Sequence, residues 1–361
     1  MIPYDDLGLV NRSFEAEFKK EFESVLKNGW YILGKQVKDF ETAYAAFNQV
    51  KHCIGVANGL DALILALRHY NFEKGSEVLV PSNTFIATIL SILHNGLTPV
   101  LVEPDLHTYN INPARIEEAI SSRTRAIIAV HLYGKCCDME AIVNIAKKRD
   151  LVLIEDAAQA HGAKFKNRLS GTFGAIGCFS FYPGKNLGAL GDGGAVVTSD
   201  DAIDKKIRQL RNYGSEIKYY NEEVGYNSRL DEIQAAFLSV KLKALGTITE
   251  HKRRLAKIYL DGLKPDIIRP VTHPDYYDVY HIFNIRHPKR DALREYLLKH
   301  DVKTEIHYPV APHLQHAMKD MFPGKTYPIS EEIHRTTLSL PCSFCHTDED
   351  VHRVIELVNA F

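Results

Sequence analysis

The first half of the chain alternates short, largely apolar runs with segments of helical periodicity. Such runs, each long enough for one buried strand, occupy positions 54–57, 77–80, 99–102, 126–130 and 151–154. After the first run, apolar side chains recur at the i, i+3, i+4 and i+7 spacing of one helix face, at Leu60, Leu63, Ile64 and Leu67. A helix is predicted over 85–94, with capping groups offered by Ser82, Asn83 and Thr84. Strands that alternate with helices favour an α/β fold with a mostly parallel central sheet.

The second half has a different pattern. Helical periodicity covers 230–245, and a long basic helix is predicted around 250–263. An alternating strand follows at 280–285, and then a helix over 291–300. We therefore predict a large domain over 1–247 and a smaller C-terminal α+β domain over 248–361.

Composition and charge narrow the class of protein. The 361 residues are 45% hydrophobic and 25% charged, which is ordinary for a globular chain. The net charge of −1 argues against a dedicated nucleic-acid binder. No apolar run approaches the roughly 18 residues of a membrane span, and the first residues lack the pattern of a signal peptide. We expect a soluble, cytoplasmic protein with no nucleic-acid or membrane partner.

The six cysteines contain one motif-like spacing. Cys342-Ser-Phe-Cys345-His346 fits c-type haem attachment, but that modification requires an oxidising, exported context. We favour a short strand that ends near Pro341, followed by a helix that Thr347 caps. No second Cys/His pair lies at zinc-finger spacing, so no metal site is predicted.

Two polar positions follow predicted strands and are candidates for a ligand site. Asn58-Gly59-Leu60-Asp61 opens a helix, where free N–H groups can bind a phosphate, although an ordinary strand–helix turn explains the motif as well. Asp156 ends the strand at 151–154, and its carboxylate either faces a ligand or caps a helix that starts at Ala157. The residues alone leave both alternatives open.

Lys185 is the candidate nucleophile. It lies in Ser180-Phe-Tyr-Pro-Gly-Lys-Asn-Leu-Gly188, among glycine, proline and aromatic residues. A lysine desolvated in this way has a lowered pKa and can act as an amine nucleophile, whereas an isolated loop lysine would be exposed. A dinucleotide-binding loop fits poorly, because a strand at 195–198 follows rather than a helix. A lysine, a carboxylate and a phosphate-binding helix start are together what pyridoxal 5'-phosphate requires.

The motifs resemble those of a known family. Three stretches in order are similar to the fold-type I, pyridoxal-phosphate-dependent nucleotide-sugar aminotransferases of the DegT/DnrJ/EryC1/StrS family: Glu155-Asp-Ala-Ala-Gln-Ala-His-Gly162, Ser180-Phe-Tyr-Pro-Gly-Lys-Asn-Leu-Gly188 and Gly225-Tyr-Asn-Ser-Arg-Leu-Asp231. The resemblance extends from Gly29 to Pro341. It implies an aminotransferase with a large domain and a small domain.

The resemblance assigns cofactor-binding roles. It implies that Lys185 forms the Schiff base with pyridoxal phosphate and that Asp156 pairs with the pyridinium nitrogen. Further implied contacts are to the phenolic oxygen by Gln159, to the ring face by Phe85, and to the phosphate by the backbone of Gly59 and Leu60 and the hydroxyl of Ser180. Asn227 is expected to reach the phosphate in the neighbouring subunit, which implies a homodimer with shared active sites.

The resemblance also implies a substrate. Lysine at position 185, where related sugar dehydratases carry histidine, favours transamination. Other stretches, such as Ser82-Asn-Thr-Phe-Ile-Ala-Thr88, resemble the members that aminate C3 of dTDP-linked 3-keto-6-deoxyhexoses, usually with L-glutamate as donor. The implied substrate-binding residues are Tyr182, Lys218, Tyr219, Arg229, His307 and Tyr308. The alternatives are a C4 aminotransferase for a nucleotide-linked 4-keto-6-deoxyhexose, a nicotinamide oxidoreductase and a regulatory protein that keeps the fold.

Overall fold

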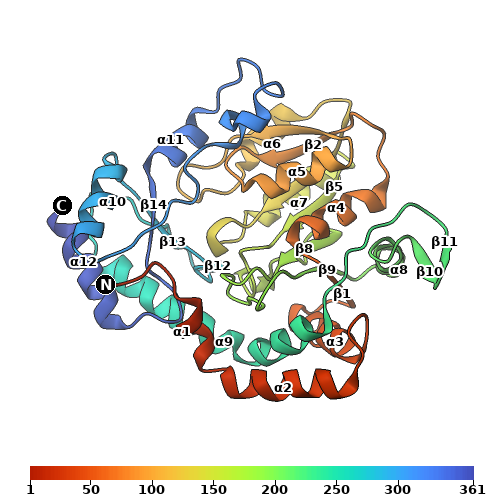
Figure 1. Cartoon of the computed structure of the whole chain (residues 1–361). Helices are drawn as coiled ribbons and strands as arrows, with labels where there is room; N and C mark the ends of the chain where they lie inside the picture. The colour runs from red at the N-terminus through yellow and green to blue at the C-terminus, as the bar shows by residue number, and fades with distance from the viewer.

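A seven-stranded sheet forms the centre of the computed structural model, which describes residues 1–361. The strands lie in the order β1 (His52–Val56), β9 (Gly194–Thr198), β8 (Ile176–Ser180), β5 (Val152–Asp156), β4 (Thr124–Val130), β2 (Glu77–Pro81) and β3 (Thr98–Val102). Only β9 runs antiparallel to its neighbours. The predicted α/β fold with a mostly parallel sheet is therefore confirmed (Figure 1).

Helices cover both faces of this sheet. One face packs against α4 (Gly59–Tyr70), α5 (Ile86–His94) and α8 (Asp201–Leu210). The other face packs against α3 (Lys35–Asn48), α6 (Pro113–Ala119), α7 (Met139–Lys148) and the first part of α9 (Glu232–Gly262). Successive residues of one strand enter different cores, as Val78 and Leu79 do. Burial on both faces explains why these strands appear in the sequence as apolar runs rather than as alternating patterns.

The C-terminal part has its own core of 19 buried residues, which begins at Leu255. It contains β13 (Phe283–Arg286) paired antiparallel with β14 (Thr337–Leu340), together with α10 (Arg290–Lys299) and α12 (Asp348–Ala360). The predicted cap of the last helix is confirmed, because the hydroxyl of Thr347 accepts from the Asp350 N–H at 3.2 Å. Helix α11 (Pro328–Thr336) precedes β14.

The helix α9 differs from the two separate helical segments that the sequence predicts. It is one continuous helix of 31 residues and passes through the predicted domain boundary at 247. Gly246 lowers helix propensity there by only about 1 kcal/mol relative to alanine. Contacts of α9 with α2 (Glu15–Asn28), α3 and α12 outweigh that cost. The division at 247 stays a prediction, with α9 as the element common to both parts.

The remaining elements are short and peripheral. They are α1 (Leu7–Arg12), a three-stranded sheet of β12 (Tyr276–Tyr277), β6 (Lys164–Phe165) and β7 (Arg168–Leu169), and a hairpin of β10 (Ser215–Ile217) and β11 (Tyr220–Asn221). Three 3₁₀ turns lie at Leu132–Gly134, Pro312–Leu314 and His316–Met318. The hairpin projects from one side of the molecule (Figure 1). None of the helices is both long enough and apolar enough to span a membrane.

Candidate active site

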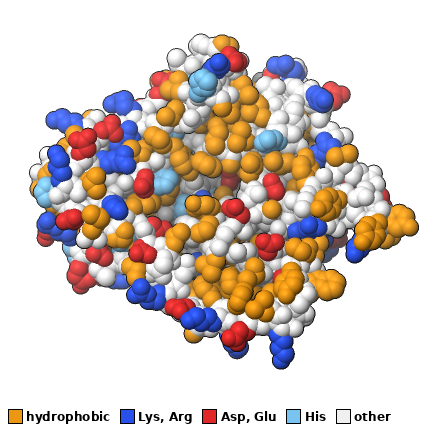
Figure 2. Space-filling view, in the orientation of Figure 1, with side chains coloured by type: hydrophobic (Ala, Val, Ile, Leu, Met, Phe, Trp, Pro, Cys, Tyr) orange, Lys and Arg blue, Asp and Glu red, His pale blue; other side chains and the backbone are white.

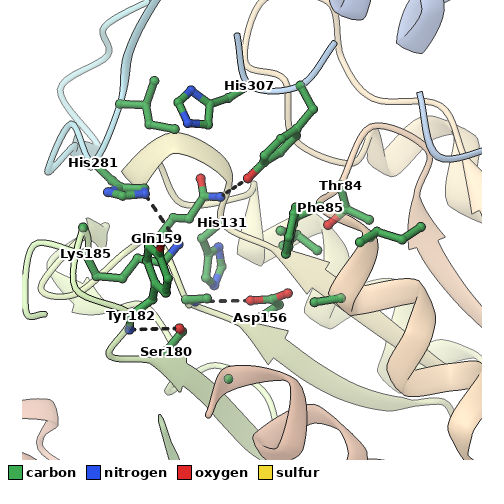
Figure 3. A pocket seen from close by; sticks show the side chains of 18 of the residues that line it. Thr84, Phe85, His131, Asp156, Gln159, Ser180, Tyr182, Lys185, His281 and His307 are labelled. Atoms are coloured by element: carbon green, nitrogen blue, oxygen red, sulfur yellow. Dashed lines mark hydrogen bonds between the residues drawn. The ribbon is translucent and has the colours of Figure 1, made fainter. Parts of the chain in front are cut away.

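A cavity of about 820 Å³ opens where the carboxyl ends of five parallel strands meet the C-terminal part of the chain. The segments that leave β1, β2, β4, β5 and β8 contribute to its lining, and α9 and β13 approach it from the other side. Ligands of open α/β sheets bind at such strand ends, because loops from neighbouring strands converge there. Figure 3 shows the side chains that point into this space.

Lys185 lies in the cavity and is not an exposed loop lysine. Its backbone N–H donates to the carbonyl oxygen of Tyr182 at 2.8 Å, which closes a turn after β8. Its Nζ atom lies 3.5 Å from Nε2 of His281. Burial lowers the pKa of Lys185 to about 8, against the opposing attraction of Asp156. A substantial fraction of the amine is therefore neutral near physiological pH.

Asp156 is the last residue of β5 and is buried at the base of the cavity. Its Oδ2 accepts from the Thr88 hydroxyl at 2.8 Å, and its Oδ1 accepts from the Ala158 N–H at 3.2 Å. Burial raises the pKa of Asp156, while these two hydrogen bonds and Lys185 lower it. The alternative that Asp156 caps a helix from Ala157 is wrong, because the next helix after β5 is α8.

The hydroxyl of Thr84 supports this carboxylate through Thr88. The two hydroxyl oxygens lie 2.8 Å apart, and both side chains are buried. The expectation that residues 82–84 cap the following helix is wrong. Helix α5 starts at Ile86, its N-cap is Phe85, and no side chain caps it. The Thr84 hydroxyl bonds to Thr88 instead, and a chain of hydrogen bonds leads from it to Asp156.

Gln159 connects the base of the cavity to its opposite wall. Its Oε1 accepts from the Tyr133 N–H at 2.7 Å, and its Nε2 donates to the Tyr308 hydroxyl at 2.9 Å. The ring of Tyr308 lies 5.2 Å from that of Phe85, measured between centroids. Phe85 is 48% exposed and faces the cavity, so one side of its ring is free to cover a planar ligand.

The start of α4 and the end of β8 form a cradle for an anion. Asn58 caps α4 by accepting from the Asp61 N–H at 2.8 Å. A Cβ atom at Gly59 would lie 2.6 Å from Cβ of Ser180, so only glycine fits there. Leu60 and the Ser180 side chain line the same part of the cavity. Free backbone N–H groups and a hydroxyl at a helix start suit a phosphate.

His161 fixes the backbone at Ser180 from behind. Its Nε2 lies 2.9 Å from the Ser180 carbonyl oxygen, and its Nδ1 lies 2.8 Å from the Tyr44 hydroxyl. Burial lowers the pKa of His161 to about 3, so the ring is neutral. A neutral ring that accepts from Tyr44 can donate to the carbonyl, which orders the strand end that carries the Ser180 hydroxyl.

The substrate-binding residues expected from the resemblance fall into two groups. Tyr182, His307 and Tyr308 line the cavity. Nδ1 of His307 lies 2.9 Å from the Ser339 hydroxyl, and burial lowers the pKa of His307 to about 4.

The other three expected substrate-binding residues, Lys218, Tyr219 and Arg229, lie outside the cavity lining. So does Asn227, which the resemblance assigns to the cofactor phosphate. Tyr219 is 83% exposed on the projecting hairpin, and its neighbour Lys218 lies 4.9 Å above its ring. Arg229 donates to the Asn212 side chain at 3.0 Å. A single chain does not bring these residues to Lys185.

Sequence analysis missed two residues of this cavity, His281 and Lys252. His281 immediately precedes the buried residues of β13, and Lys252 lies within a helix whose periodicity is explained by packing. Burial and the nearby cations Lys185 and Lys252 hold the pKa of His281 well below its usual value, so its ring is neutral. Neither residue belongs to a motif, and only the folded chain brings them near Lys185.

The fold and the lysine–aspartate pair are those of an aminotransferase. The chain belongs to the DegT/DnrJ/EryC1/StrS aminotransferase family, whose model matches residues 12–359. The two curated relatives described next are sugar-nucleotide transaminases, and the protein is an enzyme of this class.

Two curated relatives and one solved structure illustrate the similarity. The chain is 51% identical to the dTDP-3-amino-3,6-dideoxy-alpha-D-galactopyranose transaminase of Aneurinibacillus thermoaerophilus, over 100% of this chain and 99% of the relative. It is 44% identical to the dTDP-3-amino-3,4,6-trideoxy-alpha-D-glucose transaminase of Streptomyces venezuelae, over 94% and 90%. The structure of S. venezuelae DesV in complex with a ketimine intermediate superposes with a TM-score of 0.97 at 43% identity, over 99% and 98%.

The family implies pyridoxal phosphate, and the residues of the cavity fit that group. Because residue 59 is glycine, the start of α4 can lie close to Ser180. No side chain at position 59 then occupies the space where a phosphate would bind. Asp156 is a buried carboxylate that would suit a ring nitrogen, and Lys185 is an amine with a lowered pKa.

Proposed function

We propose that the protein transfers an amino group from L-glutamate to C3 of a dTDP-linked 3-keto-6-deoxyhexose. The products are a dTDP-3-amino-3,6-dideoxyhexose and 2-oxoglutarate. The observation that carries the chemistry is the Lys185 amine, which lies in the cavity with its pKa lowered to about 8. The 51% identity with the dTDP-3-amino-3,6-dideoxygalactose transaminase supports the carbon position and the nucleotide.

Pyridoxal 5'-phosphate is the proposed cofactor. Gly59, Leu60 and Ser180 would hold its phosphate, Phe85 would cover its ring, and Gln159 would face its phenolic oxygen. When bound, the group withdraws electrons from the carbon that loses a proton. The buried carboxylate of Asp156 favours a protonated ring nitrogen, because a negative charge in a buried site stabilises a nearby positive charge.

Lys185 is the proposed proton carrier. With the cofactor and the amino donor bound, the free Nζ would be placed to accept the proton from the donor's α-carbon. A neutral amine is needed for that step, and the lowered pKa provides it near pH 8. In the half-reaction with the ketosugar, the same atom would deliver a proton to the sugar carbon that receives the amino group.

The sugar would occupy the part of the cavity between Tyr182, His307 and Tyr308. Tyr182 is 59% exposed at the rim and His307 lies deeper, so the pair spans the depth of the opening. The hydroxyl of Tyr308 is already oriented by Gln159.

A homodimer would complete the site. Large hydrophobic side chains are exposed on this chain, among them Trp30 at 61% and Tyr31 at 54%. Hydrophobic side chains gather in several groups across the face shown in Figure 2. A second copy placed over such a surface would bury it. It could also bring Asn227 to the phosphate, and Lys218, Tyr219 and Arg229 to the substrate, across the interface. Light scattering of the purified protein tests the assembly.

Incubation with L-glutamate and a panel of dTDP-ketosugars tests the function. Mass spectrometry should detect an amino sugar and 2-oxoglutarate, and NMR of the product should place the nitrogen on C3. Nitrogen on C4 would instead identify the alternative activity, on a nucleotide-linked 4-keto-6-deoxyhexose. The Lys185→Ala variant should give no product, and a variant as active as the wild type would refute the proposal.

A further inference from the structure

The cavity continues beyond Lys185 into a region that none of the roles assigned above uses. The N-terminal segment contributes Tyr4 and Asp5 to this region, α9 contributes Lys252, and the segment after β14 contributes Cys342 and Ser343. The region lies on the side of the cavity formed by the C-terminal part, opposite the phosphate cradle at the start of α4.

Lys252 is a buried ammonium without an anionic partner. Only 5% of the residue is exposed, and its Nζ donates to one acceptor, the backbone carbonyl of His281, at 3.1 Å. It forms no salt bridge. Burial lowers the pKa of Lys252, as expected for a charge that lacks a close counter-ion. Buried charges in proteins are normally paired, so a cation that faces a cavity without a partner indicates an anionic ligand.

The nearest carboxylate does not fill that role. Asp5 raises the pKa of Lys252 from a distance, but its own Oδ1 accepts from the Ser343 hydroxyl at 2.6 Å and from the Asp6 N–H at 2.9 Å. These two donors hold the carboxylate in place. The two lysine protons that do not bond to His281 are left for a ligand.

His281 fixes the relation between the two amines of the cavity. Its backbone carbonyl contacts Lys252, and its imidazole faces Lys185 at 3.5 Å. The two amines therefore contact different ends of His281: Lys252 contacts the backbone carbonyl, and Lys185 contacts the imidazole. The α-carboxylate of an amino donor is bonded to the reacting carbon and must lie beside Lys185. A carboxylate at Lys252 is farther away, as the end of an acidic side chain is.

We propose that Lys252 binds the side-chain carboxylate of the amino donor and so selects an acidic amino acid. This inference rests on the proposed function, because it takes transamination as the reaction. A buried ammonium discriminates strongly, since a donor without the distal charge would leave the cation unpaired.

The half-reaction with the amino donor tests this role without any sugar. In the Lys252→Met holoenzyme, kcat/KM for L-glutamate should fall by at least about 30-fold, as follows from removing one partner of a buried charge pair. The change in cofactor absorbance on mixing with L-glutamate measures it. The same variant should react with L-norvaline faster than the wild type does, because a donor without the distal carboxylate no longer leaves a buried cation unpaired. The Lys252→Arg variant should recover most of the glutamate activity.

A matched control is available on the same helix. Lys241 is also buried and forms no salt bridge, and burial lowers its pKa to about 8. Unlike Lys252, it donates to the Asn11 side chain and does not line the cavity. Lys241→Met should leave the ratio of L-glutamate to L-norvaline reactivity unchanged.

Calorimetry with glutarate gives a readout that involves no turnover: the wild type should bind it, and Lys252→Met should bind it at least about tenfold more weakly.

The proposal is overturned if Lys252→Met keeps the wild-type preference for L-glutamate over L-norvaline. It is also overturned if the ketosugar half-reaction falls as much as the glutamate half-reaction, because the lysine would then serve the sugar. If Lys252→Met does not fold, failure of the wild type to bind glutarate refutes the proposal independently. A failure of the proposed function looks different: no ketosugar of the panel would be aminated, while the glutamate half-reaction would still depend on Lys252.

Discussion

Nζ of Lys185 lies 3.5 Å from Nε2 of His281, and these two residues are 96 positions apart in the sequence. The histidine is the only side chain within hydrogen-bonding distance of the lysine amine. Its ring is neutral, because burial and the surrounding cations hold its pKa well below the usual value. A neutral ring nitrogen can accept a hydrogen bond from the ammonium form of Lys185.

Removal of this acceptor should change the titration of the amine. A hydrogen bond to the charged form favours that form, so His281→Leu should lower the pKa of Lys185 further below about 8. The acidic limb of the pH profile of the glutamate half-reaction should move to lower pH. The rate at the optimum should fall about tenfold, because the amine is no longer oriented. His281→Gln, which keeps an acceptor, should restore the wild-type limb. A shift to higher pH would contradict the expectation.

The wild-type enzyme should itself show this amine in its pH dependence. The neutral form of Lys185 accepts the proton, so its availability rises with pH up to the pKa and is constant above it. The single-turnover rate with L-glutamate should therefore increase about tenfold per pH unit below pH 8 and level off above about 8. Stopped-flow absorbance over pH 6 to 10 measures the profile, within the range where the protein stays folded. A rate that falls between pH 6.5 and 8 would exclude this role for the amine.

Thr88 should control the ionisation of Asp156. Its hydroxyl donates to Oδ2 at 2.8 Å and stabilises the charged carboxylate against the effect of burial. Thr88→Val removes this bond in nearly the same volume and should raise the pKa of Asp156. Activity should fall by about ten- to a hundredfold, as expected for one hydrogen bond to a charged group. The loss should be largest at low pH. Thr88→Ser, which keeps the hydroxyl, is the control, and equal losses in both variants would show that the fit of the side chain matters rather than its hydrogen bond.

The sequence predicted the parts of the site that single motifs contain. Gly59 and Lys185 follow strands and Asp156 ends one, and parallel strands bring their carboxyl ends to one edge of the sheet. Lys252 and His281 have no such signal, because their position depends on how the C-terminal part packs against the sheet. The assigned roles of Asn227 and its neighbours require a second chain.

The same contrast applies to the fold. The apolar runs located the strands of the central sheet, since burial on both faces makes them continuous. Sequence analysis predicts two helical segments where α9 is one helix, and Gly246 lies between those two segments. Tertiary contacts with α2, α3 and α12 keep it one continuous helix. The local pattern of apolar and polar residues contains no information about such contacts.

Gly246→Ala should therefore stabilise the protein. A Cβ atom at this position would meet no atom within 4 Å, and the backbone there is helical. Replacement of a helical glycine by alanine should add about 1 kcal/mol to the free energy of unfolding. Urea denaturation of the wild type and the variant measures the difference. Gly171→Ala is the opposing control: its φ is +80° and its Cβ would lie 2.6 Å from the Phe179 ring, so it should destabilise.

Gly59→Ala should weaken both cofactor binding and folding. The new Cβ would lie 2.6 Å from Cβ of Ser180, at the place assigned to the phosphate. Position 59 opens α4, and its φ is not in the left-handed region, so alanine is compatible with the backbone itself. The variant should unfold at a lower temperature than the wild type, because the contact at 2.6 Å can be relieved only by a shift of the backbone, and its affinity for the cofactor is therefore measured well below that midpoint. It should bind pyridoxal phosphate at least about tenfold more weakly, as measured by fluorescence titration, since the strand end and the helix start no longer meet around the anion. Ser180→Ala keeps the space and removes only the hydroxyl, so its loss should be smaller. If Gly59→Ala bound the cofactor as tightly as the wild type, the phosphate would have to lie elsewhere in the cavity.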